Sequence, residues 1–432
     1  MRAVVHRSVI DGSVAAPPSK SYTHRAIVCG LLSSGTTRIR DPLFSDDTEI
    51  TLRVSRMMGA DVNMKDDIEI TGPSELKAPP SEIDCHGSGT TLRIFTALSS
   101  LTSGTCLLTG DDTLRRRPMG DLLEALCKLG VDAKSVNGND RPPVEIHGRG
   151  LTGGKTSIRG DVTSQYITGL LFACSRAKGD SRIELTTRLE SRPYVEMTLG
   201  IMQQFGVAAV PSGDWSYFTV QGSQEYRPQE YVIEGDFSSA AFLMAAGALA
   251  GGVSVTGLRT DSVQGDAAIV DLLESMESSV RSGGEGFAIK SDELQAIDID
   301  ASDIPDLVPV LTVLATQARG TTSIYNAGRL RLKESDRIAS TSQELRKMGA
   351  RINESKDGLV VGGPTPLHGA VLDSHDDHRI AMSCVIAGLV ADGPTIVENI
   401  ECVKKSYPGF MRDLQSIGAL VRLQENDSGG IT

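Results

Sequence analysis

The 432-residue sequence is poor in aromatic side chains and in positive charge. Aromatic residues make up 4% of the chain, with a single tryptophan, and 55 acidic residues outnumber 43 basic ones, for a net charge of −12. A protein that follows a nucleic-acid backbone needs the opposite charge balance, and one that stacks on bases needs more aromatic rings. Both features argue against a nucleic-acid-binding protein. A small anion can still be bound wherever arginine and lysine side chains converge locally.

The sequence also lacks signals for export, for membrane insertion and for a metal site. No charged, then apolar, then small-residue pattern opens the chain, so we expect a cytoplasmic protein. Residues 237–258 carry no charge, but the pattern predicts a buried helix to Ala250, a stop at Gly251 and then a strand. The seven cysteines, among them Cys127 in an apolar run, are expected to be reduced and buried, and none shows metal-ligand spacing with histidine.

A short pattern recurs six times along the chain. In five copies an apolar residue precedes a glycine, at positions 59, 130, 206, 349 and 418, and the sixth copy has Glu277 instead. The copies are 69 to 76 residues apart. Each resembles a helix closed by a C-terminal glycine and followed by a strand. A unit of this length suits a small βαβ-type fold, so we predict two domains of three units that divide near residues 224–229.

Two groups of polar residues occur where helices are expected to begin. Residues 17–21 (PPSKS) predict a helix that starts near Lys20 and places Ser21 and Arg25 on one face. Such a start suits an anion, although a capped surface helix has the same pattern. Residues 87–93 place glycines at a second helix start, which lets a ligand approach the backbone closely.

Three further groups are rich in arginine, hydroxyls or paired charges. Residues 115–117 are consecutive arginines, which fits either an anion site or a charge-balanced loop. Hydroxyls and an amide lie at expected helix starts in residues 163–166 and 191–194. Glu334 and Arg337, three apart, fit one side of a helix or an ordinary surface ion pair. The second half supplies the last group: Asp306 and residues 333–337, 377–379 and 404–408.

In combination and order these groups resemble the EPSP synthase (3-phosphoshikimate 1-carboxyvinyltransferase) family of enolpyruvyl transferases from end to end. The resemblance implies an α/β fold of two domains, inverse-barrel-like, with three βαβαββ units in each. It assigns residues 20–234 to one domain and residues 1–19 with 235–432 to the other, with the active site in the cleft. It implies transfer of the enolpyruvyl group of phosphoenolpyruvate to the 5-hydroxyl of shikimate 3-phosphate, on the route to chorismate and aromatic amino acids. Addition and elimination need no metal or other cofactor.

The resemblance also implies roles for individual residues. Asp306 is the candidate base for the 5-hydroxyl, and Glu334 and Lys20 would share proton transfer at the methylene carbon; which group makes which transfer stays open. Shikimate 3-phosphate would be bound by Lys20, Ser21, Arg25, Thr163, Ser164, Gln165, Ser191, Tyr194, Asp306 and Lys333. Phosphoenolpyruvate would be bound by Lys20, Gly89, Arg117, Gln165, Arg337, Arg379 and Lys405.

Two other functions fit parts of the sequence. The sister transferase that acts on UDP-N-acetylglucosamine typically has a cysteine in the loop before its Arg-Pro pair, whereas residues 110–120 contain none. A non-catalytic or nucleic-acid-binding repeat protein could use similar βαβ units, but the acidic charge and few aromatic residues disfavour it. We therefore expect a monomeric enzyme whose substrates are small molecules, without nucleic-acid or membrane partners.

Overall fold

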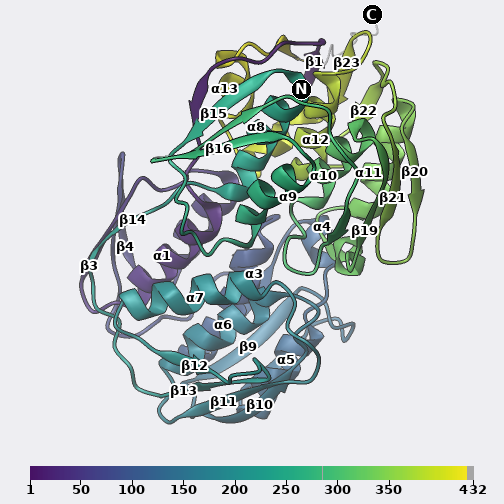
Figure 1. Cartoon of the computed structure of the whole chain (residues 1–432). Helices are drawn as coiled ribbons and strands as arrows, with labels where there is room; N and C mark the ends of the chain where they lie inside the picture. The colour runs from purple at the N-terminus through teal and green to yellow at the C-terminus, as the bar shows by residue number, and fades with distance from the viewer. Residues whose placement is uncertain (285, 426–432) are drawn as a thin grey trace, which may run out of the picture. The chain divides into compact units, whose positions relative to one another are not determined.

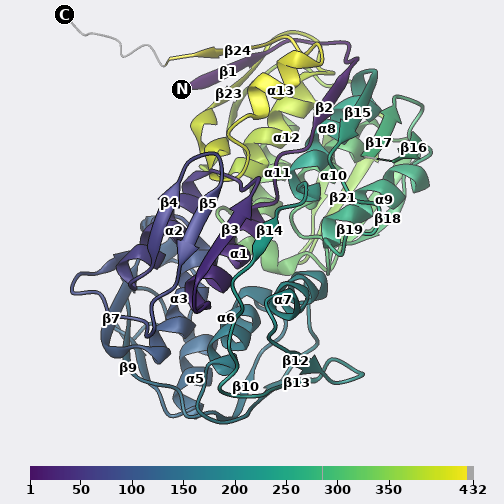
Figure 2. The ribbon, with the colours of Figure 1, turned by 90° about the vertical axis from the view of Figure 1, so that its left-hand side faces the viewer.

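The computed structural model describes residues 1–284 and 286–425 and divides the chain into two compact units (Figure 1). The continuous unit is Pro18–Ile233, and the discontinuous unit joins Met1–Pro17 to the chain from Glu234 onward. The N-terminal residues belong to the discontinuous unit because their strands pair there. Strand β1 (Arg2–Val5) lies between β23 (Thr395–Glu398) and β24 (Val421–Gln424), as Figure 2 shows, and β2 (Ser13–Ala15) pairs with β15 (Gly252–Thr256).

Each unit contains three four-stranded sheets of one design, in which a parallel pair is extended by two antiparallel strands. In the continuous unit the sheets are β14 (Glu230–Val232)–β3 (Thr36–Arg40)–β5 (Ile68–Thr71)–β4 (Asp61–Met64), β6 (Ile83–Asp84)–β7 (Ser103–Thr109)–β9 (Val144–Arg149)–β8 (Asp132–Ser135), and β10 (Gly154–Ile158)–β11 (Ser181–Leu185)–β13 (Tyr217–Val220)–β12 (Ala209–Pro211). In the discontinuous unit they are β2–β15–β17 (Gly286–Lys290)–β16 (Ser279–Gly283), β18 (Asp298–Asp300)–β19 (Gly320–Tyr325)–β21 (Leu359–Gly363)–β20 (Arg351–Glu354), and β22 (Val371–Asp373)–β23–β1–β24. The six sheets of common topology confirm the βαβαββ repeat.

The recurring sequence pattern marks the C-terminal end of one helix in every repeat. These helices are α2 (Asp46–Met57), α5 (Gly120–Lys128), α7 (Arg192–Gln204), α9 (Ile269–Ser275), α11 (Arg337–Lys347) and α13 (Phe410–Ser416). After α5, the N–H of Gly130 donates to the carbonyl of Cys127, and the N–H of the next residue donates to the carbonyl of Leu126. The other five helix ends have the same two backbone hydrogen bonds. The residue at the glycine position has a positive φ each time, including Glu277 at 64°. The predicted helix-closing motif is therefore confirmed in all six copies.

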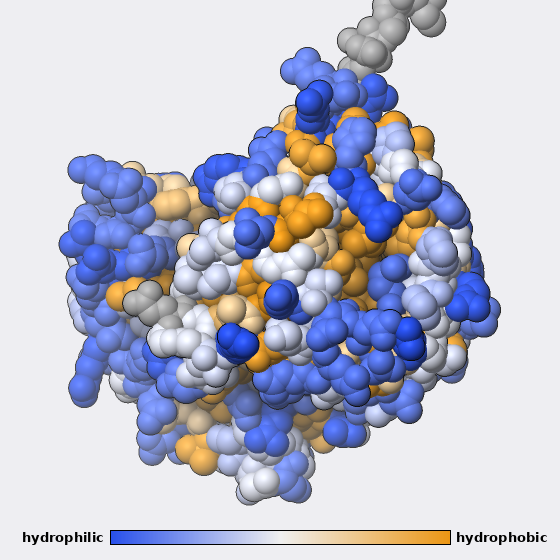
Figure 3. Space-filling model, turned by 45° about the horizontal axis from the view of Figure 1, so that its top comes forward, coloured by the Kyte–Doolittle hydropathy of each residue, from blue (hydrophilic) through white to orange (hydrophobic). Residues whose placement is uncertain are grey.

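The face of the molecule in Figure 3 is mostly polar. On the face shown in Figure 3, hydrophilic and intermediate residues cover most of the area, and apolar residues form small patches among them. No helix within the described residues has both the length and the apolarity needed to cross a membrane. All seven cysteines are free thiols and six are buried. Cys127 was expected to be buried and is exposed, because it lies on the outward face of α5, whose Leu122 and Leu126 point to the core.

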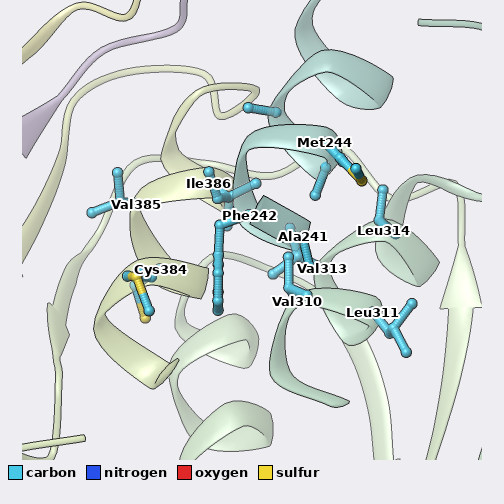
Figure 4. Close-up of a cluster of buried hydrophobic side chains, with 14 of the residues drawn as sticks. Ala241, Phe242, Met244, Val310, Leu311, Val313, Leu314, Cys384, Val385 and Ile386 are labelled. Atoms are coloured by element: carbon cyan, nitrogen blue, oxygen red, sulfur yellow. The ribbon is translucent and has the colours of Figure 1, made fainter. Parts of the chain in front are cut away.

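The centre of each unit is formed by the other helix of each repeat. These central helices are α1 (Lys20–Leu32), α3 (Gly89–Leu98) and α6 (Ser164–Ser175) in the continuous unit, and α8 (Phe237–Ala250), α10 (Val308–Gln317) and α12 (His378–Gly388) in the other. Helix α8 begins after its N-cap Asp236 and ends before Gly251, as predicted, and is buried from Phe237 to Ala248. Figure 4 shows Phe242 of α8 with Val310 of α10 and Cys384 of α12 in one apolar cluster.

Candidate active site

The candidate site residues form two groups, one in each unit, and most lie at or beside the N-terminal ends of the central helices. In the continuous unit, the Ser19, Ser88 and Thr163 side chains cap α1, α3 and α6, and accept backbone N–H groups of the first turn. The remaining first-turn N–H groups have no partner within the helix and give each start a partial positive charge. The predicted helix starts at Lys20, Gly89 and Ser164 are confirmed, and each suits an anion.

Gly89 lies against the buried side chains of Arg117 and Arg93 and the half-buried side chain of Gln165. A Cβ atom on this residue would lie 2.8 Å from Nη1 of Arg117, 3.2 Å from Nη1 of Arg93 and 3.7 Å from Oε1 of Gln165. That Gln165 oxygen accepts a hydrogen bond from Arg93 Nη1 at 2.5 Å, and its Nε2 donates to Thr90 Oγ1 at 2.8 Å. Arg93 and Arg117 are only 7% and 5% exposed. Two guanidinium groups therefore meet at the start of α3, where only glycine leaves them room.

The start of α1 carries two cations with different surroundings. The Lys20 ammonium group donates to Asp47 Oδ2 at 2.9 Å in a mostly buried pair. Arg25 is 3% exposed and donates to Thr198 Oγ1 at 2.9 Å and to the Ser21 carbonyl at 2.8 Å. It also donates to the Tyr194 carbonyl at 2.9 Å. Burial lowers the pKa of Arg25 to about 10, so it stays charged at neutral pH and fixes α1 to α7.

A chain of hydroxyl groups ties the first three helices of the continuous unit together. Nδ1 of His24 contacts Thr51 Oγ1 at 2.7 Å, and that oxygen contacts Thr91 Oγ1 at 2.7 Å. The chain ends at Ser88 Oγ, 2.7 Å further on. Since Ser88 caps α3 next to Gly89, the chain fixes the position of this helix start.

The hydroxyls of the third repeat also lie at helix starts. Thr163 caps α6, and Ser164 is the first residue of that helix, 7% exposed. Ser191 precedes α7 in a left-handed conformation, with φ 53° and ψ 40°, and its side chain does not cap the helix. Non-glycine residues in this conformation are strained and occur often at functional sites. The structure thus brings Ser191 and Tyr194 to the start of α7, three residues apart.

The discontinuous unit concentrates its charges around Arg337. This side chain, 2% exposed, donates to Asp306 Oδ1 at 2.7 Å, to Glu334 Oε2 at 2.8 Å and to Asp377 Oδ2 at 2.8 Å. Glu334 and Arg337 are therefore paired, but not along a helix: α11 begins only at Arg337, because Asp336 caps it. The pair is also not a surface pair, since the Glu334 side chain is 17% exposed.

Cations surround Asp306 in addition to Arg337. Lys333 Nζ lies 3.4 Å from Oδ1, and Arg379 Nη2 lies 3.7 Å from Oδ2. Burial works to raise the pKa of Asp306, but the charges of Lys333, Arg337 and Arg379 outweigh it and hold this pKa well below its usual range. Burial lowers the pKa of Lys333 in turn. As it stands, Asp306 is a charged but weak base.

A second carboxyl nearby was missed by the sequence analysis. Asp266 is 1% exposed, and burial, with the charge of Asp306 added, raises its pKa to about 7. It accepts a hydrogen bond from Ser238 Oγ, and the Ser238 carbonyl accepts one from Arg379 Nη1 at 2.7 Å. No motif marks Asp266, because it lies in the short helix η2 (Gly265–Ala268) and its Ser238 partner lies in a different element, at the start of α8.

The last predicted cation, Lys405, lies at the end of η4 (Ile400–Lys405). Its Nζ donates to the Asp376 carbonyl at 2.9 Å, just before α12. Asp377 caps α12 by accepting the Arg379 N–H at 2.9 Å, while it also holds Arg337. Lys405, Arg337 and Arg379 therefore share one turn as their support. Nowhere in the described residues do three histidine, cysteine or acidic side chains gather as a metal ion requires.

Comparison with known proteins gives one family. The model of the EPSP synthase (3-phosphoshikimate 1-carboxyvinyltransferase) family matches residues 4–414. A 3-phosphoshikimate 1-carboxyvinyltransferase of Methanothrix thermoacetophila is 47% identical over 422 residues, 97% of this chain and 98% of the relative. That of Methanocorpusculum labreanum is 45% identical over 426 residues, 98% and 100% of the two chains. A solved EPSP synthase of Acinetobacter baumannii aligns with a TM-score of 0.82 and 27% identity, over 98% of this chain and 100% of that one. The chain therefore belongs to the EPSP synthase family.

Proposed function

We propose that this protein transfers the enolpyruvyl group of phosphoenolpyruvate to the 5-hydroxyl of shikimate 3-phosphate and releases phosphate. The observation that carries the proposal is the buried Arg337, in contact with Asp306 and Glu334, in a chain of this family. The reaction needs carboxylates that accept and return protons beside cations that neutralise phosphates and carboxylates, and this network supplies both.

Shikimate 3-phosphate is assigned to the continuous unit. Its phosphate would be bound by Thr163, Ser164 and Ser191, because two helix starts offer hydroxyls and backbone N–H groups there. Arg25 and Ser21 would hold its carboxylate. Gln165 and Tyr194 would complete the pocket, and Lys20, Lys333 and Asp306 would contact the reacting side of the ring.

Phosphoenolpyruvate is assigned to the cations of both groups. Arg117 beside Gly89, with Lys20 and Gln165, would contact it from the continuous unit, and Arg337, Arg379 and Lys405 from the other. One substrate pair then requires residues of both units at once. Binding of the doubly charged shikimate phosphate should draw the units together and exclude water. Small-angle scattering without compaction on adding this ligand would contradict the closure.

The environment of Asp306 suggests how the base is activated. Of the three cations that lower its pKa, Arg337 and Arg379 are assigned to phosphoenolpyruvate and Lys333 to shikimate 3-phosphate, so the bound substrate anions compete for their charge. The pKa of Asp306 then rises, and the carboxylate becomes a better acceptor for the 5-hydroxyl proton. As that oxygen attacks C2 of phosphoenolpyruvate, Glu334 or Lys20 donates a proton to the methylene carbon. Return of a methyl proton with loss of phosphate restores the double bond.

The test is phosphate release by the purified protein with phosphoenolpyruvate and shikimate 3-phosphate, with UDP-N-acetylglucosamine as the alternative acceptor. Release only with shikimate 3-phosphate, and a product heavier by one enolpyruvyl group, is the expected result. Release only with the nucleotide sugar, or with neither acceptor, would refute the proposal. Single-turnover rates of Asp306→Ala, Glu334→Gln and Lys20→Met then assign the proton transfers.

The protein is further proposed to act as a monomer in the cytoplasm, without a nucleic-acid partner. The acidic net charge supports the last point, because phosphate backbones repel it. Light scattering after size-exclusion chromatography tests the first, and a salt-dependent gel shift tests the last. A stable dimer or a shift at physiological salt would overturn the respective statement.

A further inference from the structure

The six repeats allow each position to be compared with five structural equivalents. Five residues before the helix-closing position, four of the other repeats have an apolar side chain and one has an aspartate: Val54, Ala125, Ile201, Leu272 and Asp413. Helix α11 departs from the apolar pattern by burying a charge fully, because its Glu344 side chain is 0% exposed. Its carboxylate therefore occupies a place that this fold normally fills with hydrocarbon, at a desolvation cost that needs compensation.

The compensation comes from three donors that meet at the Glu344 carboxylate. His375 Nε2 lies 2.9 Å from Oε1, Lys347 Nζ donates to Oε2 at 2.7 Å, and the backbone N–H of Asp373 donates to Oε2 at 2.9 Å. Lys347 belongs to the same helix. The contacts to Asp373 and His375 instead join α11 to the turn of residues 374–377, which leads from β22 into α12.

The turn itself does not require such a carboxylate. His375 and Asp376 have φ values of 53° and 54°, and the His375 N–H donates to Asp373 Oδ1 at 2.9 Å. The second repeat forms a similar turn before α3, in which His86 has φ 43° and donates to Asp84 Oδ1 at 2.8 Å. There the imidazole is exposed and contacts a guanidinium group of α2 at 3.2 Å. A similar turn thus forms without a buried glutamate, so Glu344 serves something more than the turn's existence.

What distinguishes the turn at 374–377 is the set of cations that depends on it. The carbonyl of Asp376 accepts the Lys405 ammonium group, and the Asp377 carboxylate holds the Arg337 guanidinium group. Asp377 also caps the helix that begins with His378 and Arg379. A displacement of the turn would therefore move three cations together, and these are the three assigned to phosphoenolpyruvate in this unit.

We propose that Glu344 and His375 are a positioning pair that fixes the 374–377 turn, and through it Lys405, Arg337 and Arg379, in the arrangement that binds phosphoenolpyruvate. The inference rests on the proposed function for the identity of the anion. Neither residue is assigned a contact with substrate. Their effect is on the affinity for the anion, so it falls on phosphoenolpyruvate and not on shikimate 3-phosphate.

The pair also gives the site a dependence on pH. The charged groups that face the His375 ring are Glu344 and Lys347 of α11 and Asp373 at the end of β22. The hydrogen bond that His375 donates to the Glu344 carboxylate raises the pKa of His375 above its usual value. The charged pair is therefore complete at pH values below that pKa and is lost as the pH rises through it. Affinity for phosphoenolpyruvate should fall over the same pH range.

The experiment compares His375→Leu, which removes the donor, with His375→Gln, which retains one. His147→Gln is the matched control, because His147 contacts Glu145 at 3.0 Å in a partly exposed pair and neither residue is assigned to the site. We expect KM for phosphoenolpyruvate to rise by about tenfold in the Leu variant, equivalent to about 1.4 kcal/mol, and less in the Gln variant. KM for shikimate 3-phosphate should stay within about twofold in both variants, and the control should match wild type. The pH dependence of KM for phosphoenolpyruvate should disappear in the Gln variant.

Calorimetric titration with phosphoenolpyruvate, in the presence of shikimate 3-phosphate, separates this inference from the proposed function. Weaker binding in the Leu variant supports the positioning role even if wild type shows no turnover, which would refute the function alone. An active wild type with an unchanged KM for phosphoenolpyruvate in a folded Leu variant would overturn the inference. Equal rises in both KM values would also overturn it, because they indicate general loss of structure.

Discussion

The helix-closing position of the fourth repeat offers a direct test of how the repeats are stabilised. Five repeats have glycine there and one has Glu277, which adopts the same left-handed conformation with φ 64°. Its side chain is exposed and has no hydrogen-bond or ion-pair partner among the described residues. The backbone bonds at this end, Glu277 N–H to Glu274 and Ser278 N–H to Leu273, do not depend on the side chain. We predict that Glu277→Gly stabilises the protein.

The size of the effect follows from three contributions, of which two favour the glycine variant and one opposes it. A left-handed conformation costs a non-glycine residue about 1–2 kcal/mol. Glycine returns roughly 0.4–1 kcal/mol of this, because it adds freedom to the unfolded chain. Removing a carboxylate from the negative end of α9 contributes about 0.3 kcal/mol more at low salt. The expected gain is therefore about 1 kcal/mol, which should raise Tm by about 2–4 °C in a unit of this size.

The assay is urea and thermal unfolding of the variant beside Gly349→Ala, the reverse change in the next repeat. Gly349 has φ 95°, and a Cβ there would lie 3.6 Å from the nearest atom, so strain and not overlap decides its effect. This control should lose about 1 kcal/mol. A loss of stability in Glu277→Gly, or no loss in Gly349→Ala, would refute the reasoning.

Three further predictions concern buried polar groups. In Gly89→Ala the added methyl group would lie 2.8 Å from Arg117 Nη1 and must displace it, so steady-state kinetics should show a higher KM for phosphoenolpyruvate; an unchanged value would contradict the placement. Arg337→Met leaves three carboxylates without their shared cation and should cost about 3–5 kcal/mol in urea unfolding, and a loss below about 1 kcal/mol would count against the network. Burial lowers the pKa of His24, so below pH about 6.5 the unfolded chain binds a proton that the folded chain does not. As the pH is lowered below that value, the free energy of unfolding should decrease by up to about 1.4 kcal/mol per pH unit. Urea unfolding at pH 7.5 and 5.5 should show a smaller decrease in His24→Gln than in the wild type.

The repeat could be predicted from the sequence because its signals are local. A left-handed closing residue, a capping side chain and an alternating strand each depend on a few neighbouring residues. The helix of residues 237–250 shows this, since Asp236 caps it and Gly251 ends it as expected. Cys127 shows where such reasoning fails: an apolar run does not say which face of a helix points outward.

The candidate site was predicted less completely, because its contacts connect residues far apart in the sequence. Arg337 meets Asp306 and Asp377 from three different elements, and no spacing within the chain indicates those pairs. The pairing of Glu334 with Arg337 was expected along a helix, whereas the N-cap at Asp336 places Glu334 before it. Asp266 has no motif at all, and only the fold brings it to Ser238.

The internal repeat allows each residue to be compared with its equivalents in the other five repeats, and this comparison shows what the scaffold alone requires at each position. Glu277 and Glu344 both depart from the pattern of their equivalents. Glu277 is exposed, and its side chain makes no hydrogen bond or ion pair within the part of the chain that the structure describes, so its strain is an uncompensated cost that the fold tolerates. Glu344 is buried, and its carboxylate has acquired donors from two separate elements. Burial of the Glu344 carboxylate is costly, and the contacts that compensate it lead to the polar groups of the 374–377 turn. Selection for binding can explain such a residue, whereas selection for stability alone cannot.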